Sequence, residues 1–141
     1  MGPKRLQDFA GAWRLARRID DRRAGAEGRL EGRAVFAPGE GGLICDEVGV
    51  LTLPGLAPME ARRRYVWREG GPGRIAVFFD DGRPFHDFAL GPGAGAEHVC
   101  TPDLYRVRYD FTRWPHWRAT WAVTGPRKDY ISVSDYAPQK S

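Results

Sequence analysis

Two histidines and a cysteine in the second half of the chain have side chains that could hold a metal ion. His86, His98 and Cys100 carry the nitrogen and sulfur atoms that Zn²⁺ takes as ligands. His98 and Cys100 are two residues apart, so on an extended strand their side chains share one face. A zinc site is therefore one interpretation. The interpretation that we adopt needs no metal: both histidines hydrogen-bond interior tyrosines or line a wet pocket.

The same residues also invite a catalytic interpretation. Cys100 beside His86 would pair a nucleophile with its base. The sequence shows no third residue to orient that base, and a buried cysteine is usually inert packing. We therefore assign no catalytic residue. The alternative is an enzyme that uses His86 or His98 as acid and base, with Arg63 holding an anion.

Arginine is the residue type best suited to bind an anion inside a protein. It keeps its charge when it leaves water, and its forked donors match a carboxylate or phosphate. Arg63 and Arg17 are the candidates for this role, and Lys128 is a further one. Alternatively, Arg63 forms an internal ion pair with Glu47 that has only a structural role. The sequence leaves both interpretations open.

The elements that would position these residues are short strands. Turn-forming residues recur about every 8–12 residues, with Asp81-Gly82 as the strongest hairpin signal. Only residues 3–10 favour a helical turn. The predicted strands are 12–20, 28–37, 43–53, 59–68, 74–80, 83–90, 97–112 with a bulge or bend at 101–102, 117–124 and 128–136. Because every link is short and closure removes sheet edges, we predict an all-β, closed up-and-down antiparallel barrel of about eight to ten strands.

Turn geometry also predicts which residues face one another across neighbouring strands. The predicted pairs are Glu47 with Arg63, Tyr65 with Val77, Trp67 with Ile75, Val77 with His86, His86 with Cys100, Phe88 with His98, Tyr109 with Ala119, Val107 with Trp121 and Trp121 with Tyr130. The face that these pairs define is aromatic and is the predicted interior. Burying an unpaired charge costs several kcal/mol, so charged groups on that face must be paired, hydrated or functional. The predicted pocket residues are Arg17, Glu47, Arg63, Tyr65, His86, His98, Tyr105, Tyr109 and Tyr130.

Composition limits the class of protein. The chain has 141 residues, 42% of them hydrophobic, which predicts one domain, residues 1–141, with its own core. It has no apolar run that would span a membrane, and its first residues do not resemble a signal peptide. We therefore expect a cytoplasmic protein in which Cys45 and Cys100 remain thiols. The net charge of +4 comes from arginines spread along the chain, which argues against nucleic-acid binding.

The start of the first strand resembles a known superfamily. Phe9-x-Gly11-x-Trp13 at the head of a hairpin meander is similar to the calycins, which comprise lipocalins, fatty-acid-binding proteins and bacterial relatives. The resemblance implies that Trp13 closes one end of the barrel and that Arg127 or Lys128 packs over it. It also implies an interior arginine and tyrosine that hold an acid, and it adds haem, bound through a histidine, as an alternative ligand.

The whole chain resembles an uncharacterised family of bacterial proteins with a lipocalin-like barrel. The matching segments are Phe9-x-Gly11-x-Trp13-x-Leu15, His98-x-Cys100-x-x-Asp103-x-Tyr105-x-Val107-x-Tyr109 and Gly125-Pro126-Arg127-Lys128-Asp129-Tyr130. This resemblance implies a fold and no established activity.

These observations predict a barrel that binds a small, anionic and partly apolar molecule without a cofactor. The expected partner is that ligand, not nucleic acid or a membrane, and a homodimer is left open. A third class is an interaction module whose barrel is packed solid. A cavity lined by Arg63, His86 and tyrosines favours binding, whereas a solid core with Arg63 paired only to Glu47 excludes it.

Overall fold

The protein forms one antiparallel sheet of ten strands. The computed structural model describes residues 2–139. Its elements are a 3₁₀ turn η1 (Leu6–Phe9) and the strands β1 (Gly11–Asp21), β2 (Ala26–Gly39), β3 (Gly42–Thr52), β4 (Met59–Glu69), β5 (Arg74–Phe79), β6 (Pro84–Ala89), β7 (Gly93–Cys100), β8 (Asp103–Asp110), β9 (Trp117–Gly125) and β10 (Lys128–Pro138). The strand order is β6-β5-β4-β3-β2-β1-β10-β9-β8-β7. The predicted all-β, up-and-down topology is confirmed.

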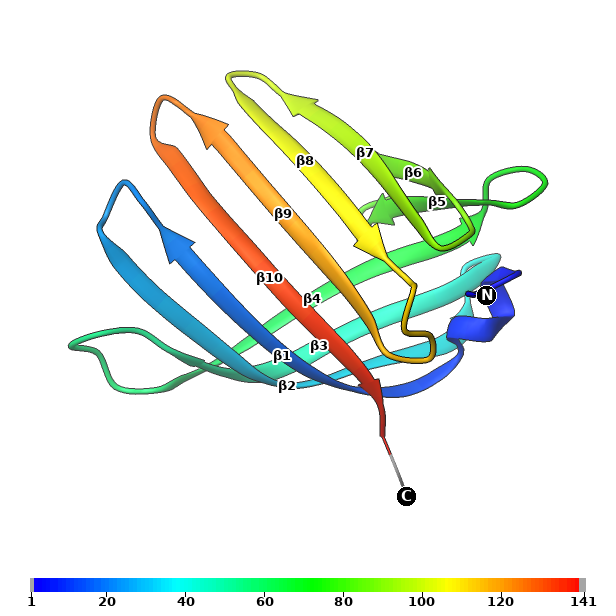
Figure 1. Cartoon of the computed structure of the whole chain (residues 1–141), viewed down its shortest axis with the longest axis horizontal. Helices are drawn as coiled ribbons and strands as arrows, with labels where there is room; N and C mark the ends of the chain where they lie inside the picture. The colour runs from blue at the N-terminus through cyan, green and yellow to red at the C-terminus, as the bar shows by residue number, and fades with distance from the viewer. Residues whose placement is uncertain (1, 140–141) are drawn as a thin grey trace.

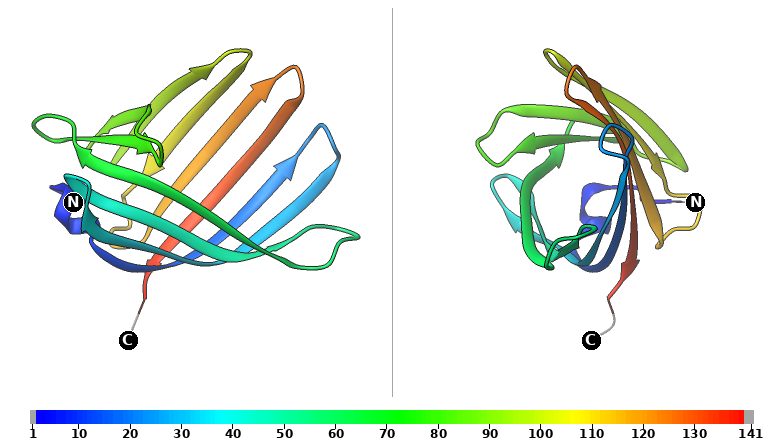
Figure 2. Two further views of the ribbon diagram at one scale, coloured as in Figure 1. Left: turned by 180° about the vertical axis from the view of Figure 1, so that it is seen from behind. Right: turned by 90° about the vertical axis from the view of Figure 1, so that its left-hand side faces the viewer.

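The sheet curls into a nearly closed barrel (Figures 1 and 2). β6 and β7 stand at the two ends of the strand order and lie near each other, but no backbone ladder joins them. The barrel is therefore not closed by backbone hydrogen bonds between β6 and β7, which corrects the predicted full closure. β6 is only six residues long and begins with Pro84, which has no N–H to donate to a ladder.

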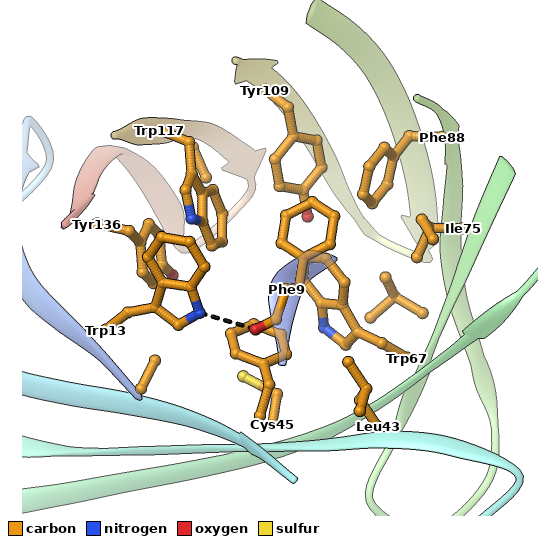
Figure 3. Close-up of a cluster of buried hydrophobic side chains, with 14 of the residues drawn as sticks. Phe9, Trp13, Leu43, Cys45, Trp67, Ile75, Phe88, Tyr109, Trp117 and Tyr136 are labelled. Carbon is orange, nitrogen blue, oxygen red and sulfur yellow. Dashed lines mark hydrogen bonds between the residues drawn. The ribbon is translucent and has the colours of Figure 1, made fainter. Parts of the chain in front are cut away.

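Aromatic side chains around η1 close one end of the barrel (Figure 3). The Phe9 ring is fully buried, and its centroid lies between 5.1 and 6.1 Å from five other aromatic rings. Trp13 is also buried, and its indole Nε1 donates a hydrogen bond of 2.8 Å to the Phe9 carbonyl oxygen. Gly11 joins η1 to β1 with φ at +118°, a conformation that favours glycine. The Phe9-x-Gly11-x-Trp13 segment therefore forms the plug.

The cation predicted to pack over Trp13 lies elsewhere. Antiparallel pairing of β1 with β10 places Trp13 opposite Pro138 and Asp21 opposite Tyr130. Arg127 and Lys128 precede Tyr130, so they lie at the other end of the barrel. This expectation is wrong, because the strand that begins with Lys128 runs toward Trp13 and reaches it only at its last residues.

The predicted strand 97–112 is a hairpin of two strands. The chain turns at Thr101 and Pro102, which places His98 opposite Tyr105 and Cys100 opposite Asp103. The predicted loop of residues 91–95 becomes part of β7 from Gly93 onward. Backbone pairing with β8 outweighs the weak strand preference of glycine and alanine there.

Two other predicted registers are shifted by two residues. Tyr65 pairs with Phe79 and not Val77, and Trp121 pairs with Ser132 and not Tyr130. A shift of two keeps every side chain on its predicted face, because strand side chains alternate with a period of two. The predicted interior is thus preserved although the pairs differ.

Candidate ligand-binding site

A cavity of about 780 Å³ occupies the barrel interior and opens at the end opposite the aromatic plug. Its mouth includes Asp21 at the end of β1, Arg83 in the β5–β6 turn and Cys100 at the end of β7. Every residue predicted to line the pocket does so: Arg17, Glu47, Arg63, Tyr65, His86, His98, Tyr105, Tyr109 and Tyr130. The barrel is therefore hollow and not packed solid.

Arg17 and Glu47 form a buried ion pair on the cavity wall. Arg17 Nη2 lies 2.8 Å from Glu47 Oε1, and both side chains are less than a tenth exposed. Arg17 Nε donates to Ser134 Oγ at 2.6 Å, and the Tyr136 hydroxyl donates to Glu47 Oε2 at 2.7 Å. Burial alone would lower the pKa of Arg17, but the Glu47 carboxylate, together with the nearby Tyr136 and Tyr65, raises that pKa overall. The two charges cancel inside the barrel.

Arg63 is opposite Glu47 in the β3–β4 ladder, as predicted, but does not pair with it. Glu47 turns instead to Arg17, because the two long side chains meet inside the barrel. The Arg63 side chain is exposed at the cavity mouth, and within residues 2–139 no carboxylate forms an ion pair with it. The rim acid Asp21 accepts a hydrogen bond from the Ala24 amide of its own turn. Arg63 is thus an available cation beside the cavity.

Two tyrosines flank this cation. Burial raises the pKa of Tyr65, and the nearby Arg63 guanidinium opposes that rise. Burial also raises the pKa of Tyr130, with Arg63 again acting in the opposite direction. Both phenols therefore remain protonated at neutral pH and present hydroxyl groups beside the guanidinium. Such a group of donors suits a carboxylate or sulfonate.

His86 and Tyr109 form a second polar pair deeper in the barrel. His86 Nε2 lies 2.9 Å from the Tyr109 hydroxyl, and His86 Nδ1 is buried without a hydrogen-bond partner. Burial, and secondarily the neighbouring His98, lowers the pKa of His86 to about 4. The imidazole is therefore neutral at pH 7. Such a low pKa makes His86 a weak general base.

We predict that His86 makes the fold sensitive to acid. The unfolded chain binds a proton near the ordinary pKa of 6.5, whereas the folded chain resists until about pH 4. The free energy of unfolding thus falls as the pH drops through this window, by about 2 kcal/mol between pH 7 and pH 4.5. Urea unfolding at both pH values measures this loss. The loss should shrink in His86→Gln and persist in His116→Gln, a change at an exposed residue. Equal losses in all three proteins would contradict the assignment.

Lys128 does not line the cavity itself but is bonded to Tyr105, which does. Its Nζ donates to the Tyr105 hydroxyl at 2.9 Å and lies 3.1 Å from Asp103 Oδ2. These bonds raise the pKa of Lys128, the bond to Tyr105 most strongly. Lys128 therefore fixes a pocket tyrosine at the mouth and is already paired, unlike Arg63.

The candidate metal ligands do not converge. Cys100 is exposed at the tip of the β7–β8 hairpin, and β6, which carries His86, forms no ladder with β7. Among residues 2–139, no group of three or more His, Cys, Asp or Glu side chains is placed to hold a metal ion. Burial raises the pKa of Cys45 well above its ordinary value, so that thiol is inert packing.

Sequence reasoning missed several lining residues. The most important is Phe85, which is buried together with its neighbour His86. Strict alternation would send one of the two outward, but the β5–β6 register shifts between Val77 and Phe78. The only sequence signal for this irregularity is the pair of adjacent aromatic residues Phe85 and His86 next to a short hairpin. Other missed lining residues are Phe79, Arg83, Ser132 and Tyr136.

A larger hollow of about 1050 Å³ lies on the outside of the barrel, over β1, β2, β9 and β10. It is lined by polar side chains such as Arg118 and Asp135, which already pair with each other at 2.6 Å. Its other charged side chains, such as Arg14 and Glu31, are exposed to water, which screens their attraction for a ligand. We therefore place the candidate site in the interior cavity, although it is the smaller space.

Comparison with known proteins agrees with this architecture. Residues 9–138 match the model of a family described as "Family of unknown function (DUF6314)". The chain belongs to this family. Among curated proteins, no significant sequence match is found. In residues 2–139, no helix is long and apolar enough to cross a membrane.

Among solved structures, this family member is similar to the S-type phycobiliprotein lyase CPES from Guillardia theta. The TM-score is 0.67 and the sequence identity is 8%, and the match covers 96% of this chain and 91% of the lyase chain. At this identity, the likeness shows a shared fold. The lyase therefore has the same barrel fold as this protein.

Proposed function

We propose that this protein is a small-molecule-binding barrel that holds an anionic and partly apolar ligand in its interior. The observation that best supports this function is Arg63, a cation at the mouth of an aromatic-walled cavity with no carboxylate paired to it in residues 2–139. Arg17 and Glu47 neutralise each other, and His86 is uncharged, so Arg63 provides the charge that a ligand can neutralise. Pockets of a few hundred Å³ with few polar groups are typical of ligand sites.

The name of the structural neighbour is consistent with this proposal. It is a phycobiliprotein lyase, so an enzyme of bilin-carrying proteins has a barrel of this shape. A bilin is conjugated and carries carboxylates, which places it within the ligand class that we propose. The resemblance of Phe9-x-Gly11-x-Trp13 to the start of the calycin barrels, which include lipocalins, also supports the proposal.

The test is the affinity of carboxylates and of matched neutral molecules. We expect decanoate and 2-naphthoate to bind more tightly than decanol and 2-naphthalenemethanol. Arg63→Gln should weaken binding of the acids about tenfold, because it removes a charge-assisted hydrogen bond, and should leave the alcohols unchanged. Arg62→Gln is the matched control, since Arg62 is exposed and pairs with Glu60. Isothermal titration calorimetry measures all four ligands. If the acids bind no better than the alcohols, or Arg63→Gln has no effect, the proposal fails.

Binding is favoured over catalysis in this cavity. The enzyme alternative relies on His86 or His98 as acid and base, and the low pKa of His86 suits a hydrogen-bonding role better. Haem binding is not favoured either, because His86 Nε2 bonds Tyr109 and His98 packs edge-on against Phe85. A cytoplasmic location, a single domain over residues 1–141 and a homodimer stay predictions.

A further inference from the structure

The side chain of Phe85 is buried among other aromatic rings that line the cavity. The centroid of the Phe85 ring lies 4.4 Å from that of Phe79, 5.0 Å from that of Trp121 and 5.8 Å from that of Tyr65. The interplanar angles are 22°, 10° and 22°, so each of these rings is nearly parallel to Phe85. Tyr65 comes from β4 and Trp121 from β9, on different walls of the barrel. Phe85 therefore fills a slot lined by flat rings of Tyr65, Phe79 and Trp121, as a planar guest would.

The strand that carries Phe85 is weakly held. β6 pairs with β5 on one side and forms no ladder with β7 on the other. The β5–β6 ladder is itself interrupted between Val77 and Phe78. A segment with few backbone partners opens at low cost compared with the central strands. Phe85 can therefore be withdrawn from the slot without breaking the barrel.

The arrangement with Phe85 inside leaves a polar atom unsatisfied. The Phe85 ring packs 4.6 Å from the His86 imidazole, almost perpendicular to it. His86 is only 9% exposed, and its Nδ1 has no hydrogen-bond partner in residues 2–139. A buried nitrogen of this kind destabilises the state that contains it. Withdrawal of Phe85 removes a group that packs directly on this imidazole.

We propose that the slot lined by Tyr65, Phe79 and Trp121 is a subsite for the flat ring of an aromatic carboxylic acid, and that Phe85 fills it in the ligand-free protein. This inference rests on the proposed function, because it assigns the carboxylate to Arg63. Arg63 and Tyr65 are two residues apart on β4, about 7 Å along the strand and on one face. That spacing matches an acid group attached directly to one or two fused rings. The ligand class is therefore narrower than an amphiphilic acid in general.

The test compares an aromatic with an aliphatic acid of similar size. We expect 2-naphthoate to bind roughly tenfold more tightly than decanoate, although burial of apolar surface alone would favour the longer chain. Phe85→Ala should strengthen 2-naphthoate binding about threefold by removing the internal competitor. Trp121→Leu should weaken 2-naphthoate binding by about the same factor, and should weaken decanoate binding less. Phe78→Ala is the control, because Phe78 lies one residue from the cavity-lining Val77 and Phe79 and packs against Arg68, outside the cavity.

Each outcome is decisive. Equal affinity for the two acids, or equal weakening of both by Trp121→Leu, overturns the ring subsite and leaves the proposed function standing. If neither acid binds, the proposed function fails and the subsite fails with it. If a variant does not fold, proton NMR spectroscopy of 2-naphthoate bound to the unchanged protein gives the answer instead. Stacking between two rings shifts the proton resonances of bound 2-naphthoate strongly upfield, and unshifted resonances of the bound acid overturn the proposal.

Discussion

Replacing Glu47 by alanine is expected to lower the free energy of unfolding by about 3 kcal/mol. The substitution leaves the Arg17 guanidinium, which is 7% exposed, without its counter-charge, and it removes the acceptor of the Tyr136 hydroxyl. Removing one partner of a buried pair costs more than the pair itself contributes, because the other charge stays desolvated. Urea unfolding followed by tryptophan fluorescence measures the loss.

Asp46 provides the matched control on the same strand. Asp46→Ala breaks an exposed ion pair with Arg64, so we expect a loss below about 1 kcal/mol. The double variant Arg17→Met with Glu47→Leu should recover much of the loss, since it removes both charges together. If Glu47→Ala costs no more than Asp46→Ala, the interior pair is solvated and not structural.

Replacing Phe9 by alanine is expected to cost about 3–5 kcal/mol. Phe9 is fully buried, and its ring contacts aromatic residues from β2, β4 and the β8–β9 link, including Trp67 at 5.2 Å. The substitution opens a void in the plug that the surrounding rings cannot fill. Thermal and urea unfolding both report the loss.

The Phe9→Ala variant also tests whether the plug contributes to stability without contributing to ligand binding. Phe9 does not line the cavity, so the folded fraction of Phe9→Ala should bind 2-naphthoate with unchanged affinity. Gln7→Ala, an exposed position on the same turn, should leave stability within about 0.5 kcal/mol. A loss below about 1 kcal/mol in Phe9→Ala would mean that η1 is not part of the barrel core.

The interior face was predictable from sequence because strand alternation has only two states. Trp13 and Arg17 lie on the same side of β1 whatever the exact register, and both are buried. Two predicted registers were wrong by two residues, so Trp121 and Tyr130 kept their faces although their partners changed. The predicted pairs of His86 with Cys100 and Phe88 with His98 were wrong outright, because β6 and β7 form no ladder. The cavity lining was therefore recovered even where the pairing was wrong.

Long side chains and irregular strands were beyond this reasoning. Register predicts only directly opposed residues, whereas Arg17 reaches Glu47 on a strand that is not its neighbour in the sheet. Phe85 enters the cavity through an interruption of the β5–β6 ladder that no turn signal marks. The turn at Thr101 and Pro102 has the same sequence signal as a bulge or bend within one strand, because a turn and a bulge both place a proline where no ladder donor is needed.

The most direct test of the central claim is the mass of the intact protein under native electrospray conditions. With 2-naphthoate in excess, we predict a complex of one acid per chain, abundant in the unchanged protein and in Arg62→Gln and scarce in Arg63→Gln. A small organic acid retained through purification should follow the same pattern. A spectrum with only the polypeptide mass, or an equally abundant complex in Arg63→Gln, would contradict an anion-binding cavity anchored by Arg63.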